Sequence, residues 1–249
     1  IPSTNTSLLQ CDDDTDGISI FDLTKAGNFI KNNDSQFVNQ GYYETLADAQ
    51  AKTNPILNPE RYTNKGADQI IFARIENTFG CYKIAEITLN ISNSNIPNQS
   101  PVATCDGDAV QDGLYQFDLN AEVTPQILTG LPAGLAISYF LTATDALTET
   151  NQLPNIFKNT TPNSQTIYAR VVNGPSCYDI TSIELIVNTF DPPNFTDETH
   201  YLCKGDEMTL NVAAGFSSYA WSNGSSTNSS VINSPGDYSV TVKDANGCE

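Results

Sequence analysis

Polar and apolar residues alternate along most of the chain, which is the pattern of strands with one buried face. The alternation predicts six strands, at Ile18–Leu23, Gln69–Glu76, Ile84–Ser92, Leu135–Thr142, Thr166–Val172 and Ile180–Val187. Helical periodicity is confined to Tyr43–Lys52 and to a counterpart near Thr144–Leu147. Many short strands separated by turn residues predict an all-β fold of tandem Ig-like β-sandwich domains.

The same order of motifs occurs twice. Near the start of each copy, an acidic segment that begins with a cysteine precedes a Phe-Asp-Leu motif: Cys11 precedes Phe21-Asp22-Leu23, and Cys105 precedes Phe117-Asp118-Leu119. Near the end of each copy, an apolar segment that ends in Ala-Arg precedes a Cys-Tyr pair: Ile71–Arg74 precedes Cys81-Tyr82, and Ile167–Arg170 precedes Cys177-Tyr178. Such self-similarity indicates two copies of one fold. With the polar, proline-bearing junctions near 93–101 and 191–194, it predicts repeat 1 at residues 1–94, repeat 2 at 95–190 and a C-terminal domain at 191–249.

The C-terminal domain is shorter and has its own motifs. Its strand around Trp221 and the later segment Gly236–Val242 suit the core of an Ig-like sandwich. We interpret Trp221 as a core residue and not as a platform for sugar stacking. The sequence stops one residue after Cys248, so we expect the natural chain to continue and this domain to be incomplete.

Six cysteines are the strongest guide to the cellular compartment: Cys11, Cys81, Cys105, Cys177, Cys203 and Cys248. Six cysteines allow about fifteen pairings, and the repeat selects among them because equivalent copies should bond in the same way. Copies that fold separately should each close their own bond, which predicts Cys11–Cys81, Cys105–Cys177 and Cys203–Cys248, one disulfide per domain. Disulfides indicate an oxidising location. Zinc and redox sites are disfavoured, because no C-x-x-C spacing occurs and His200 is the single histidine.

The charge restricts the partners. The formal net charge is −18, from 11 basic and 29 acidic residues. Such a chain repels nucleic acids and anionic membrane surfaces, so we expect neither as a partner, and its acidity favours cations. No apolar run is long enough to span a bilayer, so direct membrane insertion is not expected.

The acids beside the first cysteine of each repeat are the candidate ligand site. Asp12, Asp14 and Asp16 followed by Gly17 match the first half of a calcium loop, but the position of the closing glutamate in an EF-hand is Leu23. We therefore predict a calcium loop of another type in each repeat, with the ligands Asp12, Asp14, Asp16 and Asp22, and Asp106, Asp108, Asp112 and Asp118. The alternative is that these are turn aspartates whose side chains accept hydrogen bonds from the backbone.

Catalysis has little support in the sequence. One histidine and paired cysteines leave no convincing nucleophile and base, and we predict that the chain is not an enzyme. Arg74 and Arg170 occupy matching strand positions. They could contact a ligand, but we favour arginines that pair with a carboxylate of their own domain.

The two motif blocks resemble repeats of very large surface proteins of gliding Gram-negative bacteria. Those proteins are exported by the type IX secretion system and often carry a gliding-motility-associated sorting domain. The C-terminal domain, with Trp221-Ser222-Asn223-Gly224 and Asp244–Cys248, resembles the PKD-like or Ig-like domains found late in them. The resemblance implies an extracellular cell-surface location, with the secretion machinery or other surface proteins as partners.

Two functions follow as expectations. The first is a non-catalytic stalk segment of a surface adhesin or gliding-associated protein, closed by disulfides and stiffened by calcium. The second is a module that binds carbohydrate or another protein.

Overall fold

The structure is a computed structural model, and it describes residues 4–12, 14, 16–108, 110–192 and 195–249. Pro193 and Asn194 of the second proline-bearing junction lie outside the described residues. Internal contacts divide the chain into two compact units. Unit 1 comprises Ile1–Ser100, Asp118–Phe157 and Thr166–Glu184, and unit 2 comprises Pro101–Phe117, Lys158–Gln165 and Leu185–Glu249. Repeat 2 therefore contributes residues to both units.

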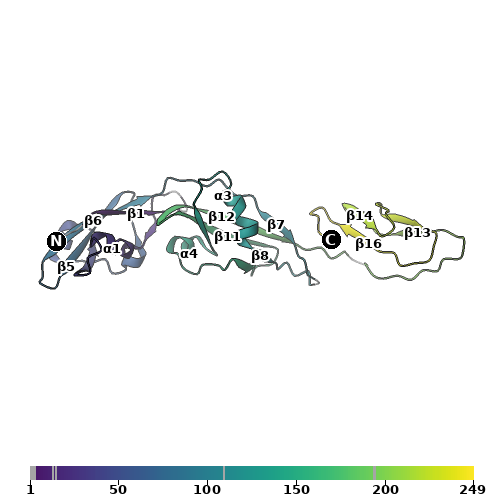
Figure 1. Ribbon diagram of the computed structural model, residues 1–249, viewed down its shortest axis with the longest axis horizontal. Coiled ribbons are helices and arrows are strands. Elements are labelled where there is room, and N and C mark those ends of the chain that lie inside the picture. The colour runs from purple at the N-terminus through teal and green to yellow at the C-terminus, as the bar shows by residue number, and fades with distance from the viewer. Residues whose placement is uncertain (1–3, 13, 15, 109, 193–194) are drawn as a thin grey trace. The chain divides into compact units, whose positions relative to one another are not determined.

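Repeat 1 is built on a four-stranded sheet. Its strands are β1 (Thr6–Gln10), β2 (Ile20–Phe21), β3 (Phe37–Tyr43), β4 (Tyr62–Thr63), β5 (Gln69–Asn77) and β6 (Tyr82–Ile91). The sheet, of which Figure 1 labels β1, β5 and β6, has the order β1-β6-β5-β3. Strand β2 pairs with β4 in a second, two-stranded sheet. The first strand runs parallel to the last, with Thr6 opposite Ile87 and Gln10 opposite Ile91.

Short helices connect these strands: η1 (Leu23–Ala26), α1 (Gly27–Ile30), α2 (Leu46–Ala51) and η2 (Pro59–Arg61). The predicted helix at Tyr43–Lys52 is confirmed as α2, which begins after Thr45 because the Thr45 side chain accepts a hydrogen bond from the Asp48 amide. The predicted strand Ile18–Leu23 is shorter than expected. Asp22 caps η1 by accepting from the Thr24 amide, so the chain turns into a helix directly after β2.

Repeat 2 has the same order of elements. They are β7 (Val102–Cys105), β8 (Gln116–Asp118), η3 (Leu119–Val123), α3 (Thr124–Leu128), β9 (Ala136–Phe140), α4 (Ala143–Thr148), β10 (Ile156–Lys158), β11 (Ser164–Asn173) and β12 (Ser176–Asn188). Its main sheet has the order β7-β12-β11-β9, and β7 runs parallel to β12. Five of the predicted strands correspond to β5, β6, β9, β11 and β12, and the helix near Thr144–Leu147 is confirmed as α4.

The apolar positions of the alternating strands form the core. In repeat 1 the buried cluster joins Phe21, Leu23 and Ile30 to Ile71, Ile87 and Leu89 of the main sheet, so helix and strands share one interior. Counterparts in repeat 2, among them Phe117, Leu119 and Ile167, are fully buried as well. An all-β fold of tandem Ig-like sandwich domains is thereby confirmed.

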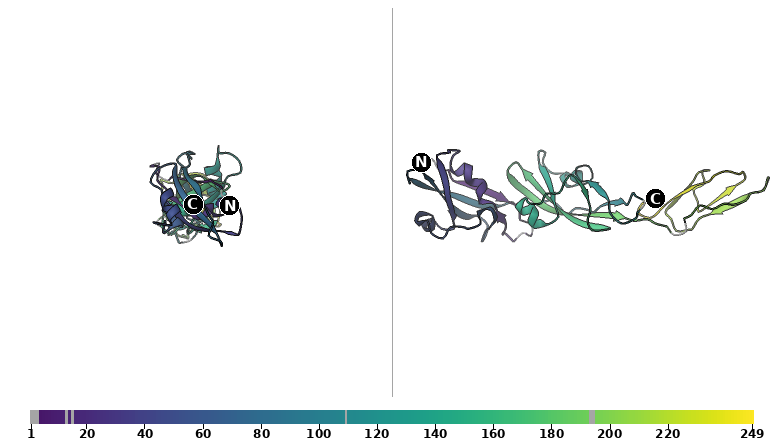
Figure 2. Two further views of the ribbon diagram at one scale, coloured as in Figure 1. Left: turned by 90° about the vertical axis from the view of Figure 1, so that its left-hand side faces the viewer. Right: turned by 90° about the horizontal axis from the view of Figure 1, so that it is seen from below.

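The C-terminal domain consists of two small antiparallel sheets in unit 2 (Figure 2). Strand β13 (Met208–Asn211) pairs with β15 (Ser229–Ile232), and β14 (Ser218–Trp221) pairs with β16 (Val240–Lys243). Trp221 is buried, and its ring nitrogen donates to the Thr227 carbonyl at 2.8 Å. The interpretation of Trp221 as a core residue is confirmed. Within the described ranges, no helix combines the length and apolarity needed to cross a membrane.

The predicted disulfide pairing is wrong. The bonds join Cys11 to Cys177 and Cys105 to Cys248, with Cα–Cα distances of 5.3 and 5.5 Å, and they leave Cys81 and Cys203 free and exposed.

Sheet topology explains why pairing within a repeat fails. Gln10 lies opposite Ile91 at one end of β6, so Cys11 lies at that end, whereas Cys81 precedes Tyr82 at the other end of the strand. Ten residues of strand separate these ends by roughly 30 Å, far beyond the roughly 7 Å limit for a disulfide.

Candidate functional site: a disulfide-linked junction beside acidic loops

The bond between Cys11 and Cys177 joins repeat 1 to repeat 2 within unit 1. Cys11 follows β1 of repeat 1, and Cys177 lies in β12 of repeat 2. Both cysteines are buried in a small apolar cluster with Leu147 and the partly buried Ile180. Helix α4 of repeat 2 also contacts strand β2 of repeat 1. The covalent bond is therefore embedded in a packed junction.

Gln10 directs the cysteine into this junction. Its side-chain amide donates to the carbonyl of Leu147 at 3.0 Å and to the carbonyl of Ile20 at 2.7 Å. Its side-chain carbonyl accepts from Nη1 of Arg170 at 2.9 Å. Gln10 is 7 % exposed, so the Leu147 carbonyl and Nη1 of Arg170 meet the Gln10 side chain at a site from which water is largely excluded. No repeated motif pointed to Gln10, because its counterpart in repeat 2 is Thr104.

Arg170 and Glu149 extend the junction with charge. Arg170 is buried and donates to the Ala146 carbonyl at 3.2 Å and to Glu149 at 2.9 Å. Glu149 also accepts from Lys25 of repeat 1 at 2.7 Å. Burial opposes ionisation of Glu149, but the hydrogen bond from Lys25 and the charges of Arg170 and Lys25 outweigh it and hold the pKa of Glu149 below its usual value.

The segment after β6 is attached to the same strand of repeat 2. The Ser92 hydroxyl donates to the Tyr178 carbonyl at 2.6 Å, and the Ile96 amide donates to the Asp179 carboxylate. Burial raises the pKa of Asp179, and the amides of Ile96 and Ile180 partly offset the effect. The connection between the repeats is thus fixed by hydrogen bonds as well as by the disulfide.

The bond between Cys105 and Cys248 repeats this arrangement in unit 2. Cys105 ends β7 of repeat 2, opposite Asn188 of β12, and Cys248 follows the last strand of the C-terminal domain. Cys248 is buried, and its amide donates to Asp244 at 2.9 Å. In both bonds the first cysteine of one domain pairs with the second cysteine of the next.

The acidic loop of repeat 1 directly follows Cys11. Carboxylate oxygens of Asp12, Asp14 and Asp16 lie within 4.8 Å of one another. Asp12 accepts from the Gly17 amide at 2.7 Å, and Asp16 accepts from the Ile18 amide at 2.7 Å. Gly17 has a φ of +80°, so the predicted glycine turn is present. The loop therefore has the close group of three carboxylates that a calcium site needs. It also has the hydrogen bonds from backbone amides to aspartate side chains that are expected of turn aspartates.

The acidic loop of repeat 2 is similar but more open. Asp106 accepts from the Gly113 amide at 2.7 Å, as Asp12 does from Gly17. Among the described residues, no group of three carboxylates that includes Asp108 and Asp112 is as close as the group in repeat 1. Asp106 is only 5 % exposed, and its Oδ1 atom is buried with no hydrogen-bond partner. A buried, unpartnered carboxylate oxygen is costly, and a cation or a water would satisfy it.

Two buried asparagines hold the loops in place. The Asn64 side chain accepts from the Ser19 amide at 2.6 Å and donates to the Gly17 carbonyl at 3.0 Å. Asn159 makes the matching bonds to the Tyr115 amide and the Gly113 carbonyl, at 2.6 and 2.9 Å. Neither residue is predicted from the sequence, although each directly follows a strand of a two-stranded sheet, β4 paired with β2 or β10 paired with β8.

The remaining predicted ligands have other contacts. Asp22 accepts from the Thr24 amide at 3.0 Å, and Asp118 accepts from the Ala121 amide at 3.0 Å, so both cap helices. The structure does not bring Asp22 into the group formed by Asp12, Asp14 and Asp16.

The two arginines pair with carboxylates of their own repeats, as we favoured. Arg74 lies 3.3 Å from Glu76, and Arg170 lies 2.9 Å from Glu149. Arg170 in addition reaches Gln10 of the preceding repeat.

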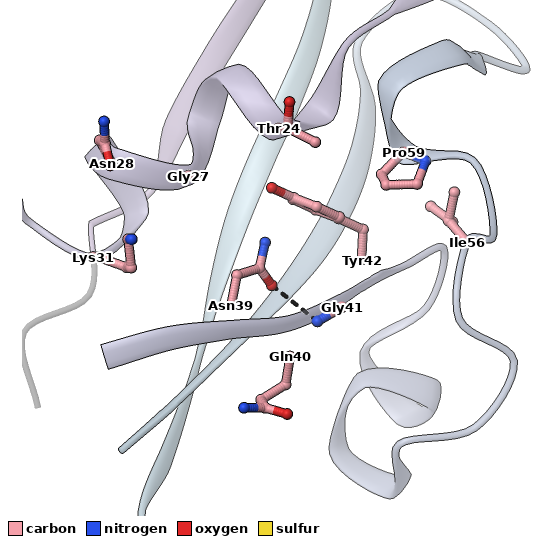
Figure 3. Close-up of a pocket in the computed structure, with 10 residues that line it drawn as sticks. All are labelled: Thr24, Gly27, Asn28, Lys31, Asn39, Gln40, Gly41, Tyr42, Ile56 and Pro59. Carbon is pink, nitrogen blue, oxygen red and sulfur yellow. Dashed lines mark hydrogen bonds between the residues drawn. The ribbon is translucent and has the colours of Figure 1, made fainter. Parts of the chain in front are cut away.

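A shallow groove of about 540 Å³ lies elsewhere on repeat 1, between β3 and the first helices (Figure 3). Asn39 and Tyr42 face it from β3, and the Asn39 side chain accepts from the Gly41 amide at 2.9 Å. Tyr42 is 5 % exposed, and burial raises its pKa to about 12. The groove therefore offers amide groups but no exposed aromatic face from Tyr42.

Comparison with known proteins supports the arrangement of the bonds. The family model of the Flavobacterium inter-domain disulphide bond domain matches residues 7–97 and again residues 101–192. No curated protein matches the sequence. Disulfides of this kind are typical of proteins that fold outside the cytoplasm.

Solved structures with several Ig domains show weak similarity. A variant of a three-domain titin segment is 11 % identical, with 98 % of this chain and 92 % of that chain covered and a TM-score of 0.23. The four N-terminal Ig domains of Dscam1 isoform 1.9 are 11 % identical, with 98 % and 69 % covered and a TM-score of 0.20. Immunoglobulin domains 1–4 of Sidekick-1 are 8 % identical, with 100 % and 72 % covered and a TM-score of 0.22. The family model, by contrast, matches two successive segments that together cover most of the sequence, and the chain belongs to the Flavobacterium inter-domain disulphide bond domain family.

Proposed function

We propose that the chain is a non-catalytic stalk segment of an extracellular surface protein, in which staggered disulfides carry mechanical load from each domain to the next. The observation that supports this function most strongly is the bond from Cys11 to Cys177, which bridges two repeats. A bond inside one domain limits only that domain's unfolding. A bond between domains also protects the connection between them.

The positions of the two bonds set the length of the unfolded chain under load. The shortest covalent route from end to end passes through residues 1–11, the Cys11–Cys177 bond and residues 177–249, which is 84 residues of the 249. The oxidised chain should therefore extend to roughly 290 Å and the reduced chain to roughly 850 Å, at about 3.4 Å per residue.

Single-molecule stretching of the whole chain, held at its termini, tests this function. We expect full extension near the shorter length when the chain is oxidised and near the longer length after reduction. Bonds within each domain would leave 65 residues in the route and give roughly 220 Å. An oxidised length of roughly 220 or 850 Å would contradict the proposal.

We also propose that calcium stiffens the loops beside the bonds. Three carboxylates converge in repeat 1, and a buried carboxylate oxygen in repeat 2 has no hydrogen-bond partner. These residues suit a hard cation that prefers oxygen ligands. With a dissociation constant of about 10⁻⁴ to 10⁻³ M, typical of extracellular modules, 10 mM calcium would add about 1.4 to 2.7 kcal/mol to the free energy of unfolding.

Thermal melts in 10 mM calcium and in EDTA test the cation directly. We expect a higher melting temperature in calcium for the wild-type chain and a smaller difference for Asp12→Asn with Asp14→Asn. Asp34→Asn is the control, because Asp34 is an acidic turn residue outside both loops. Identical wild-type melts in calcium and EDTA would exclude a stabilising cation.

The location and parent protein extend the same proposal. Support comes from the family, the interdomain disulfides and the resemblance to repeats of gliding-associated surface proteins. We propose display on the surface of a Gram-negative bacterium after type IX secretion, with the secretion machinery or other surface proteins as partners and a PKD-like C-terminal domain. Surface proteolysis of intact wild-type cells and of intact cells of a secretion-deficient strain tests this location. The chain should be cleaved only on the wild-type cells.

A binding function is the second candidate. The observation in its favour is the groove on repeat 1, where Asn28, Asn39 and Gln40 offer amide groups that suit sugar hydroxyls or a peptide backbone. A glycan array probed in the presence of calcium tests the carbohydrate form, and the variant Asn39→Ala should abolish any signal that depends on the groove.

A further inference from the structure

A glycine borders the groove on repeat 1 at a position where repeat 2 has a threonine. The helices α1 and α3 align through their buried isoleucines, Ile30 in repeat 1 and Ile127 in repeat 2. Three residues before these isoleucines stand Gly27 in repeat 1 and Thr124 in repeat 2. The difference between the two copies therefore shows which side chains open the groove.

The glycine uncovers the hydroxyl group of a buried tyrosine. Tyr42 of repeat 1 and Tyr139 of repeat 2 are equivalent, because each pairs with the alanine of the Ala-Arg motif in the adjacent strand. In repeat 2 the hydroxyl of Tyr139 lies 2.7 Å from that of Thr124. In repeat 1 even a Cβ atom on Gly27 would lie 3.9 Å from the Tyr42 hydroxyl. Figure 3 shows the Tyr42 ring pointing from β3 toward the helical segment of Gly27, and Tyr42 lines the groove.

The strand side of the groove is also more polar in repeat 1. Opposite the residue after the strand arginine stands Asn39 in repeat 1 and Ile137 in repeat 2. A β-bulge between Asn39 and Gly41 adds Gln40 to the lining of the groove. Gly41 permits this bulge, because its φ is +143°, a conformation that favours glycine. Strand β3 thus offers two amide side chains where repeat 2 has an aliphatic one.

The backbone of β3 does not favour a ligand that binds as an added strand. β3 is an edge strand of the main sheet, but its backbone groups beside the groove have partners. The Gly41 amide donates to Asn39 at 2.9 Å, and the Tyr42 carbonyl accepts from the Ile56 amide at 2.8 Å. Strand addition depends on main-chain hydrogen bonds to an exposed edge. Side-chain amides and hydroxyls remain, and these can both donate to and accept from the hydroxyl groups of a saccharide.

A lysine gives the groove a positive charge. Of the ten residues that line it, Lys31 alone is charged, although the chain has 11 basic and 29 acidic residues. Its counterpart in repeat 2, the residue after Ile127, is Leu128. Lys31 is partly buried, and in the described part of the chain no carboxylate forms an ion pair with it. Its ammonium group is therefore available to a negatively charged group of a ligand.

We propose that the groove of repeat 1 binds a saccharide that carries a carboxylate. The Lys31 ammonium pairs with the carboxylate, and Asn28, Gln40 and the Tyr42 hydroxyl bond to sugar hydroxyls. The volume of about 540 Å³ is in the range of small-molecule sites. The inference rests on the second candidate function, binding at this groove, and names its ligand class. The stalk function does not depend on it.

A glycan array probed with the intact, oxidised chain tests the ligand class. The array carries saccharides with uronic or sialic acid residues beside the methyl esters of the same saccharides, which have no charge on the carboxyl group. The buffer contains EDTA, so that a cation held by the acidic loops cannot bridge an acidic saccharide to the protein. We expect binding to at least one acidic saccharide and about tenfold weaker binding to its methyl ester, the loss that follows from removing one charge-assisted hydrogen bond.

Three variants place the binding in the groove. Gly27→Thr installs the residue of repeat 2, and its φ of −55° is one that threonine adopts without strain. Lys31→Gln removes the charge, and Lys83→Gln, at an exposed lysine of β6, is the matched control. Titration with the strongest acidic saccharide should show about tenfold weaker binding for the first two variants and no change for the control. Lys31→Gln should also bind the acid and its methyl ester equally, which a folding defect would not produce.

Each other result would overturn the inference. Equal binding of the acidic saccharides and their methyl esters by the wild-type chain would reject the ligand class and leave binding at the groove in place. Binding that both groove variants retain, or that appears only when calcium replaces EDTA, would place the site elsewhere. An array without any signal would reject the binding function as well. None of these outcomes would affect the bond from Cys11 to Cys177 or the stalk function.

Discussion

The arginine faces of the two repeats differ in occupancy more than in construction. Arg170 and Arg74 each lie buried in a central strand and donate to the carbonyl of an alanine in an earlier helix of the same repeat. One face holds Gln10 and a disulfide, and the other holds its own arginine against the Gln50 carbonyl. The comparison teaches that a buried arginine at this position can hold either the glutamine of a neighbouring repeat or a carbonyl of its own repeat.

Removing the bond between the repeats should have the largest effect. A bond that closes 166 residues stabilises by about 5 kcal/mol in the chain-entropy model. We expect Cys11→Ser with Cys177→Ser to lower the free energy of unfolding of unit 1 by about 3 to 5 kcal/mol, measured by chemical denaturation without reductant. Cys81→Ser is the matched control and should change it by less than about 0.5 kcal/mol. Equal losses in the two variants would mean that the faces do not differ as described.

Gln10→Ala should have an intermediate effect. It removes the side-chain donor to the Leu147 carbonyl and one of the two acceptors of Nη1 of Arg170, which costs about 1 to 3 kcal/mol. Its counterpart Thr104→Ala in repeat 2 should cost less, because Thr104 is only partly buried. Denaturation of both variants, with the disulfides intact, measures the difference. A larger loss of unfolding free energy for the Thr104 variant would contradict the claim that Gln10 stabilises the junction between the repeats.

The ion pair across the junction should contribute least. Lys25 and Glu149 are both about half exposed, so Lys25→Gln should cost less than about 1 kcal/mol. Because the pKa of Glu149 is lowered on folding, its contribution is present above the unfolded pKa and is lost as pH falls below about 4. Asp179, whose pKa is raised, opposes this trend. Melts of wild type and Glu149→Gln between pH 3 and 6 should converge at the acid end, and a constant gap would contradict the assignment.

Much of the fold could be predicted from the sequence because it depends on local signals. Alternation located the central strands, and helical periodicity over Tyr43–Lys52 located the helix that the structure places at Leu46–Ala51. The helix-capping role of the Phe-Asp-Leu aspartates, which we predict as metal ligands, could not be read from the sequence, since a carboxylate that caps a helix and one that binds calcium have the same local sequence. Only the fold shows that Asp22 points to the Thr24 amide.

The disulfide pairing could not be predicted, for a physical reason. Equivalent copies can pair their cysteines within each copy or each with the next, and both patterns respect the repeat. The choice depends on the parallel pairing of β1 with β6, which places Cys11 and Cys81 at opposite ends of one strand. Strand direction in a sheet is a long-range property that alternation does not record.

The connection between the repeats offers the most direct test of the central claim that each disulfide links one domain to the next. A specific protease site inserted between Asn98 and Gln99 cuts the chain between Cys11 and Cys105, outside both domain cores. After complete cleavage, we predict a single covalent species on a gel without reductant and two fragments with reductant, because Cys11 remains bonded to Cys177. Two fragments on the gel without reductant would show that each domain closes its own bond and would contradict this account.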